Sequence, residues 1–288
     1  MAKLQHRATF DIPLREVSGL CVRSGADGRD VLVAIGDARG TAVWTDMSTG
    51  VQGDWHEVDL AARSGGRIPS RDCQAEAIAS DGAGTMVVML EEPARLVVAP
   101  AGDGPVLGID LVVPAADPLS GAWNDDPNSR GEGLVLLAGG HVLVVKEKRP
   151  CALLEFGPAG HVPVGIGDGA LVGSRGTWSP PGADGPFDLL ATWPLDDSLA
   201  DEVGDLSDAA VDHRGRLVVV SDQSSRVVVL APAGPSGTPV AAAAVLKIQG
   251  SPDKAEGLAV LADGTVLVAL DRPEPKHNLL VLDGLGAD

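Results

Sequence analysis

Short apolar runs rich in Val, Leu and Ala alternate along the chain with Gly and Asp-Gly turn signals. The runs fall into groups, and a polar anchor residue opens the first run of each group. The anchors are Ser18, Glu76, Glu132, Ser207 and Glu256. An acidic partner follows the anchor by fifteen positions in four groups, and by nineteen in the first group, whose hairpin is longer. The partners are Asp37, Glu91, Glu147, Asp222 and Asp271. A repeat of this length predicts a propeller or a solenoid.

Each group predicts a small antiparallel sheet. The first strand follows the anchor, the second ends at the acidic partner, and a tight hairpin such as SDGAGT or LADGT joins them. A third strand follows in every group and a fourth in all but the last. We predict that His6 to Ile12 supplies the missing outer strand and closes the ring. The predicted fold is therefore all-β, a single β-propeller domain over residues 1–288 with five four-stranded blades.

The third group is longer than the others. It carries an irregular insertion at about residues 157–187 that is too rich in Gly and Pro for a complete blade. A degenerate sixth blade hidden in this insertion is the alternative. The one helix candidate is a turn around residues 196–202, because no long window has helical periodicity.

In a propeller the anchors and their partners would share one face, near the axis. Three carboxylates would converge there, and two like charges about 4 Å apart repel by several kcal/mol at a partly buried site. A hard cation such as Ca²⁺, neutralising Lys and Arg side chains, or a protonated carboxyl could each compensate. The predicted metal ligands are Glu76, Glu132 and Glu256, supported by Glu147 or Asp271.

The same loops carry a basic rim, made up of Arg15, Arg71, Arg130, Lys148, Arg149, Lys254 and Arg272. If these side chains point inward, the mouth could hold an anionic ligand. The predicted ligand-binding residues are Arg149, Arg272, Trp123, Asp37, Glu91 and Asp222. Trp123 would form an aromatic wall, or else it anchors its own loop.

Catalytic motifs are absent from the sequence. There is no G-x-S-x-G elbow, H-E-x-x-H pair, Walker loop or dinucleotide fingerprint. His277 alone of the histidines falls in a loop of the predicted functional face, where it is a weak candidate for a general base. A hydrogen-bonded turn residue is the other interpretation of His277.

Composition limits the partners. The chain has 22 Lys plus Arg against 40 Asp plus Glu, a net charge of -18, which disfavours nucleic acid and anionic membrane surfaces. The start of the sequence has no signal-peptide pattern, so we expect a cytoplasmic protein. The three cysteines lack a C-x-x-C spacing, and reduced, buried thiols are expected. We expect a monomer that binds a small molecule or a protein on its top face.

The repeated segments resemble the SdiA-regulated (YjiK-like) β-propeller family. They are EVSGL, AEAIA with MLEEPARL, GEGL with KEKRPCALLEF, DLSDAAVD with SDQSSRVVVL, and AEGLAVLADGTVLVALDRP. The resemblance implies a small propeller, with calcium binding in some members and no settled enzymatic activity. The E-G-L starts at Glu132 and Glu256 are more distantly similar to regucalcin-type lactonases and esterase-like phytase propellers. Ser18, Ser207 and Ala77 depart from that pattern.

Three functions follow as hypotheses. The first is a binding module whose acidic axial mouth holds a divalent cation or a small ligand. The second is a metal-dependent hydrolase of esters, lactones or phosphoesters, in which the cation would activate water. The third is a protein-interaction scaffold in which the charges are purely structural.

Overall fold

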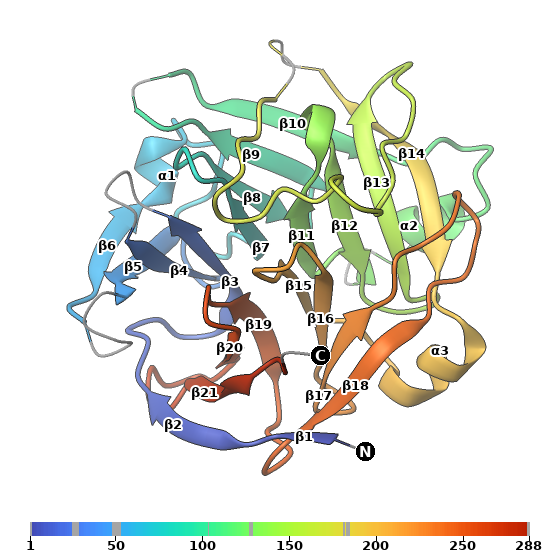
Figure 1. The fold of residues 1–288 in the computed structure, drawn as a ribbon. Helices are drawn as coiled ribbons and strands as arrows, with labels where there is room; N and C mark the ends of the chain where they lie inside the picture. Colours follow the sequence, from blue (N-terminus) through green and yellow to red (C-terminus); the bar gives the residue numbers. More distant parts are fainter. Residues whose placement is uncertain are drawn as a thin grey trace.

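The computed structural model describes residues 2–24, 29–47, 53–102, 104–126, 129–180, 182 and 185–286. Nearly all of the regular structure is β-strand, as predicted, and the sheets stand around a common centre (Figure 1). The first sheet runs in chain order through β3 (Val17–Ser24), β4 (Asp30–Gly36), β5 (Thr41–Asp46) and β6 (His56–Asp59). All of its neighbouring strands are antiparallel.

The next two antiparallel runs follow the same order. They are β7 (Ala75–Ser80), β8 (Met86–Leu90), β9 (Arg95–Ala99) and β10 (Leu107–Val112), then β11 (Gly133–Leu136), β12 (Val142–Lys146), β13 (Ala152–Pro158) and β14 (Phe187–Pro194). A short parallel pairing between the outer strands, Leu111 with Phe187 and Val112 with Asp188, joins these two runs into one eight-stranded sheet.

The remaining runs complete the circle. They are β15 (Asp208–Val211), β16 (Leu217–Ser221), β17 (Arg226–Leu230) and β18 (Ala242–Ile248), then β19 (Ala255–Val260), β20 (Thr265–Leu270) and β21 (Leu279–Gly284). The inner strands form a closed ring, because β3 contacts β7 and β19, β7 contacts β11, β11 contacts β15, and β15 contacts β19. Hydrophobic core clusters fill the spaces between neighbouring sheets.

The N-terminal segment covers two sheet edges. The strand β2 (His6–Phe10) pairs antiparallel with β21, as the sequence predicted for residues 6–12. The short strand β1 (Ala2–Leu4) adds a second, unpredicted pairing, parallel to β18 of the neighbouring sheet. Asn278 fixes the segment, since its side chain accepts from the Ile12 amide and donates to the carbonyls of Ile12 and Leu14.

Short helices lie in the connections. The predicted turn is α3 (Asp197–Val203), capped by the Asp196 side chain, which accepts from the Leu199 amide. Two single turns, α1 (Leu60–Arg63) and α2 (Ser120–Asn124), were not predicted, because a turn of this length leaves no periodic pattern. None of the helices in the described ranges is long and apolar enough to span a bilayer.

The insertion between β13 and β14 forms no strand within its described residues, apart from one isolated bridge of Leu171 to Leu137. It runs along the end of β11, where Val172 donates to the Leu136 carbonyl and Ala138 donates to the Ala170 carbonyl. It then crosses to the β7–β8 hairpin, where Gly82 donates to the Gly176 carbonyl at 2.7 Å. The insertion therefore lies across the hairpin end of the ring.

All three cysteines are free thiols, as predicted. Cys21 and Cys73 are buried and Cys151 is half-buried. Burial raises the pKa of the Cys21 thiol to about 12 and that of the Cys73 and Cys151 thiols to about 11. These values keep the thiols protonated and argue against nucleophilic roles.

Candidate functional site

The anchor residues sit on β-bulges at the starts of the inner strands. The strand pairing skips Ser18 between Val17 and Gly19, Glu76 between Ala75 and Ala77, and Glu256 between Ala255 and Gly257. Glu132 and Ser207 repeat the arrangement. The Glu132 amide donates to the carbonyl of Val145, which is also the strand partner of Gly133, and the Ser207 amide donates to the carbonyl of Val220, which is also the strand partner of Asp208. A bulge re-aims a side chain out of the regular alternation, and bulges are common beside active sites.

A left-handed residue two positions before the anchor brings the acidic partner alongside. In three sheets this residue has positive φ and its carbonyl accepts the partner's amide. The pairs are Glu16 (φ 51°) with Asp37, Gln74 (φ 49°) with Glu91, and Lys254 (φ 62°) with Asp271. This hydrogen bond joins the start of the first strand to the end of the second strand. The fifteen-residue spacing seen in the sequence is therefore set by the length of the two strands and their hairpin.

The anchors and partners thus meet at one end of the ring, which we call the acidic mouth: Glu76, Glu132, Glu256, Asp37, Glu91, Glu147, Asp222 and Asp271. Burial raises the pKa of Glu76 to about 8, with repulsion from Glu91 and Asp37 next in importance and further repulsion from Glu256 and Asp271. Burial also holds the pKa of Glu132 well above its ordinary value, and its repelling neighbours include Glu76 and Glu256. The carboxylates predicted to converge therefore do interact.

Three further mouth carboxyls, Glu256, Glu91 and Asp37, also have raised pKa values. Burial raises the pKa of Glu256 to about 7, although Lys254 opposes the shift. Burial likewise raises the pKa of Glu91 to about 7, against a hydrogen bond from the Arg130 amide. Asp37 also has a raised pKa because of its burial, and its buried Oδ1 atom has no hydrogen-bond partner among the described residues. A buried carboxylate oxygen without a partner and carboxyls with raised pKa values are both expected where negative charge is not fully compensated.

Cationic side chains reach only part of the mouth. The Lys254 ammonium lies 3.6 Å from Glu256 and 3.4 Å from Asp271, but 58% of the side chain is exposed. Lys148 pairs with Glu147 at 2.5 Å. Neutralisation by Lys and Arg, one of the three predicted remedies, is thus incomplete at Glu76 and Glu132, whose strongest charged neighbours are all carboxylates.

The serine anchors do not face a ligand. The Ser18 hydroxyl donates to the Ala75 carbonyl of the next inner strand, and the Ser207 hydroxyl accepts from the Asp222 amide. Asp222 in turn accepts from the amides of Lys254 and Ala255, so its carboxylate ties two neighbouring sheets together. These three positions are structural in the conformation described.

Three predicted ligand-binding residues have side chains that are either buried in the core or exposed. Trp123 is only 2% exposed and packs against Phe156 in the core, so the prediction of an aromatic wall is wrong, and the loop-anchor alternative fits. The Arg149 side chain is 78% exposed and lies 3.8 Å from Asp126. Arg272 is exposed, and its backbone carbonyl accepts from the Glu16 amide.

His277 lies beside the N-terminal segment. Its side chain is 74% exposed, its amide donates to Asp11 at 2.6 Å, and its Nδ1 atom is 3.8 Å from the same carboxylate. His277 therefore has the contacts of a hydrogen-bonded turn residue, the second of the two interpretations.

The predicted metal centre is not formed in the described conformation. Within the described ranges, no three His, Cys, Asp or Glu side chains are arranged to hold a metal ion. The chemistry of the mouth still suits a hard cation, because every donor is a carboxylate oxygen. A cation would be held only after side chains such as those of Glu76, Glu132 and Glu256 turn toward one another.

Asp208 is a polar residue of the channel that sequence reasoning missed. It is 1% exposed and accepts hydrogen bonds from the amides of Leu258 and Ala209, both at 2.7 Å, and more weakly from Leu20. Burial holds its pKa well above the ordinary value. It follows the anchor Ser207 at a position where the other repeats have only Gly or Ala, and that exception was the available signal.

Comparison with solved structures identifies the fold class. Glutaminyl cyclase from Myxococcus xanthus matches with a TM-score of 0.50 and 13% identity over 99% of each chain. The PQQ-bound aldose sugar dehydrogenase from Streptomyces coelicolor matches with a TM-score of 0.48 and 12% identity over 98% of each chain. A luciferin-regenerating enzyme matches with a TM-score of 0.48 and 11% identity over 97% of this chain and 96% of its own.

These neighbours are β-propeller proteins, and the chain has the propeller fold. At such low identity the likeness shows the fold alone. No protein-family model matches the sequence, and no curated protein matches it. The resemblance to the SdiA-regulated family therefore stays a prediction.

Proposed function

We propose that the chain is a five-bladed binding propeller whose acidic mouth takes up a cationic ligand, first of all a divalent cation such as Ca²⁺. The closed ring of inner strands and the pairing of β2 with β21 support five blades closed by the N-terminal strand. The bulged anchors support a functional role for the mouth, because the same distortion is repeated around the axis.

The observation that carries the proposal is the surplus of buried negative charge. Glu76 and Glu132 have raised pKa values because they are buried among other carboxyls. A bound cation would favour the ionised forms and remove this penalty, whereas in its absence protons must do so. Cation binding should therefore release protons near neutral pH, and a metal site of this kind is sensitive to pH.

A thermal melt tests the proposal. Protein stripped with EDTA is melted at pH 7.5 with and without millimolar Ca²⁺, Mg²⁺ or Mn²⁺, because binding to the native state alone raises Tm. Saturation at about 100 times Kd would add about 2.7 kcal/mol of stability. Glu132→Gln should abolish most of the shift, since it removes a central donor.

The matched control is Glu57→Gln, which makes the same chemical change at an exposed site on the outer strand β6. It should keep the full cation response. Equal responses in the two variants, or no response to any cation in the wild-type protein, would reject the proposal.

A hydrolase of esters, lactones or phosphoesters is the second candidate. It is favoured by carboxyls with pKa values of about 7 at Glu91 and Glu256 and about 8 at Glu76, which suit proton transfer near neutral pH. Turnover of a panel of these substrates that is lost in Glu76→Gln and kept in Glu57→Gln would select it. If the wild-type protein turns over none of these substrates, the hydrolase is rejected and the binding module is the remaining candidate.

A further inference from the structure

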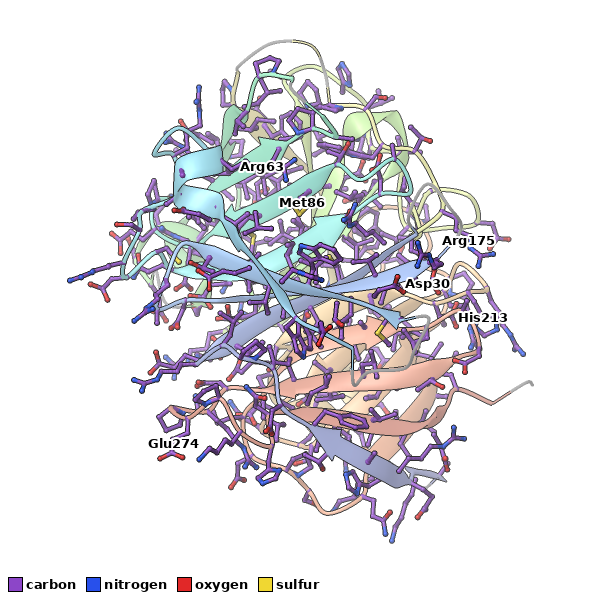
Figure 2. All side chains as sticks on the ribbon, turned by 90° about the vertical axis from the view of Figure 1, so that its left-hand side faces the viewer. Asp30, Arg63, Met86, Arg175, His213 and Glu274 are labelled. Atoms are coloured by element: carbon purple, nitrogen blue, oxygen red, sulfur yellow. The ribbon has the colours of Figure 1, made fainter. Side chains whose placement is uncertain are left out.

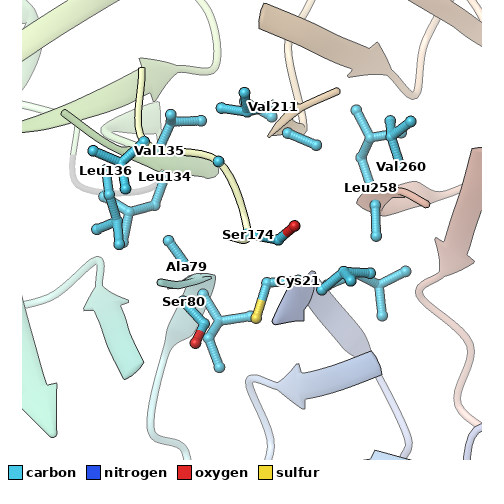
Figure 3. Close-up of a pocket in the computed structure, with 18 residues that line it drawn as sticks. Cys21, Ala79, Ser80, Leu134, Val135, Leu136, Ser174, Val211, Leu258 and Val260 are labelled. Carbon is cyan, nitrogen blue, oxygen red and sulfur yellow. The ribbon is translucent and has the colours of Figure 1, made fainter. Parts of the chain in front are cut away.

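The end of the channel opposite the acidic mouth holds a pocket of different character. Segment 172–174 of the insertion lines the channel there, and Figure 3 shows Ser174 among the ends of the inner strands. Only a small cavity of about 50 Å³ remains behind this segment. Beside it opens a pocket of about 420 Å³, which shares Gly173, Ser174, Val211 and Val260 with the cavity.

This pocket has polar side chains, one of them an arginine, over an apolar floor. Arg175 comes from the insertion and His213 from the β15–β16 hairpin, while Val211, Val260 and Leu261 supply apolar surface. Figure 2 places Arg175 and His213 at the same edge of the molecule, with Glu274, from the loop after Asp271, at the far edge. Known small-molecule pockets combine such a volume with a few converging polar groups.

Asp212, the one acid among the described residues that line the pocket, is already paired. Asp212 pairs with Arg216 at 2.7 Å and accepts hydrogen bonds from the amides of Arg214 and Arg216. Arg175, by contrast, makes no hydrogen bond or ion pair through its side chain within the described part of the chain, and the same holds for the Ser174 hydroxyl. Among the described residues that line it, the pocket therefore offers the Arg175 guanidinium and the Ser174 hydroxyl as donors, while the Asp212 carboxylate is already paired.

The backbone that carries Arg175 is firmly placed. Gly176 accepts from the Gly82 amide and donates to the Gly173 carbonyl. Gly82 lets the segment approach closely, since a Cβ atom at this residue would lie 2.7 Å from the Arg175 carbonyl carbon. A donor on a fixed backbone loses less entropy on binding than one on a free loop.

We propose that this pocket binds a small amphipathic anion, with its carboxylate or phosphate on Arg175, His213 and Ser174 and its apolar body on Val211, Val260 and Leu261. An arginine fork matches the two oxygens of such a group, and the bonds are charge-assisted. The site is independent of the cation site proposed at the acidic mouth.

The test compares ligands that share one body and differ in charge. Hexanoate, hexylamine and inorganic phosphate are titrated into the wild-type protein and followed by calorimetry. Saturable binding of hexanoate with at least tenfold preference over hexylamine is expected. Phosphate binding without hexanoate binding would show that the site takes phosphate groups. The anion part of the proposal would then stand, and the part that places an apolar body on the valine and leucine side chains would be rejected. Binding of neither anion up to 10 mM, or equal binding of hexanoate and hexylamine, overturns the proposal.

Variants then locate the site. Arg175→Gln should weaken anion binding about tenfold, the loss typical of one charge-assisted hydrogen bond. Arg214→Gln removes the same charge from the same face outside this pocket and should change the affinity less than twofold. If Arg175→Gln does not fold, judged by its melt, Ser174→Ala and His213→Asn replace it, and both should weaken binding. Unchanged affinity in the folded variants would overturn the assignment.

Discussion

The two ends of the inner strands use carboxylates in opposite ways. At the hairpin end, Asp81 accepts from the amides of Ala83, Thr85 and Trp178, and Asp263 accepts from the Thr265 amide. At Asp263 the hydrogen bond from the Thr265 amide lowers the pKa of the carboxyl. At the acidic mouth, burial and repulsion raise the pKa of Glu76 to about 8 instead.

This difference separates structural acids from candidate functional ones. A hairpin aspartate orders its own turn through local hydrogen bonds. Its carboxylate oxygens are therefore already occupied by backbone amides. Within the described residues no comparable donor bonds to Glu76 or Glu132, and the charge of these two carboxyls would weaken the folded state unless a proton or a cation compensates. Natural proteins keep such costs mainly at functional sites. The comparison therefore favours the mouth carboxyls, over the hairpin aspartates, as the place where a cation would bind.

The largest expected loss of stability comes from a substitution at the hairpin end. Trp178 is 3% exposed, its amide donates to Asp81 at 2.9 Å, and its indole donates to the His141 carbonyl at 2.8 Å. Trp178→Ala should lower the free energy of unfolding in urea by about 3–5 kcal/mol, through a cavity and the lost indole bond.

Trp178→Phe keeps most of the packing and should lose roughly 1–2 kcal/mol. In both variants the cation response of the mouth, measured as the difference in Tm with and without Ca²⁺, should stay at the wild-type value. A loss below about 1 kcal/mol in Trp178→Ala would mean that the insertion is not anchored by this residue.

A smaller effect concerns the mouth and follows from linkage. Folding raises the pKa of Glu76 from 4.5 to about 8, so the folded state keeps a proton that the unfolded chain has lost. The free energy of unfolding therefore falls as the pH rises from about 4.5 to about 8, and this contribution is complete below that window. In EDTA, Glu76→Gln should remove it, and the variant should gain on the order of 1–2 kcal/mol over the wild type between pH 5 and pH 8.5.

The measurement is urea unfolding at both pH values in cation-free buffer. Glu57→Gln is again the control and should follow the wild-type pH profile, because Glu57 is exposed on β6. If the free energy of unfolding of Glu76→Gln changes with pH as that of the wild type does, the Glu76 carboxyl is not the source of the pH dependence. The main physical argument for a cation at the mouth would then be lost.

The sequence predicted the architecture better than the site. The anchors and partners could be found because each is fixed by a repeated backbone feature, the bulge and the closing hydrogen bond, which forces a constant spacing. Trp123 was misplaced because a loop residue carries no periodic signal of burial. Asp208 was missed because its role depends on amides of two other inner strands, Leu20 and Leu258, which only the closed ring brings to it.

The insertion could not be placed from sequence for the same reason. Apart from the buried Trp178 side chain, many of its contacts are made by backbone groups of residues such as Gly176, and backbone donors have no side-chain signature. Its route to Gly82, on a different sheet, follows from tertiary packing alone. The anion pocket beside Arg175 therefore emerged only from the structure, whereas the acidic mouth was visible in the spacing of the acids.

The smallest expected effect tests how far Lys254 compensates the mouth. Its ammonium lies near both Glu256 and Asp271, but it is mostly exposed, so Lys254→Gln should cost less than about 1 kcal/mol of stability. Because the lysine competes with any cation for these carboxylates, its loss should tighten Ca²⁺ binding by roughly threefold at low salt, and less as salt screens the charges. Lys247→Gln, on the exposed outer strand β18, is the control for net charge and should leave Ca²⁺ affinity unchanged. If the two variants bind Ca²⁺ equally, Lys254 does not compete with the cation. The cation then contacts carboxylates on the Glu132 side of the mouth.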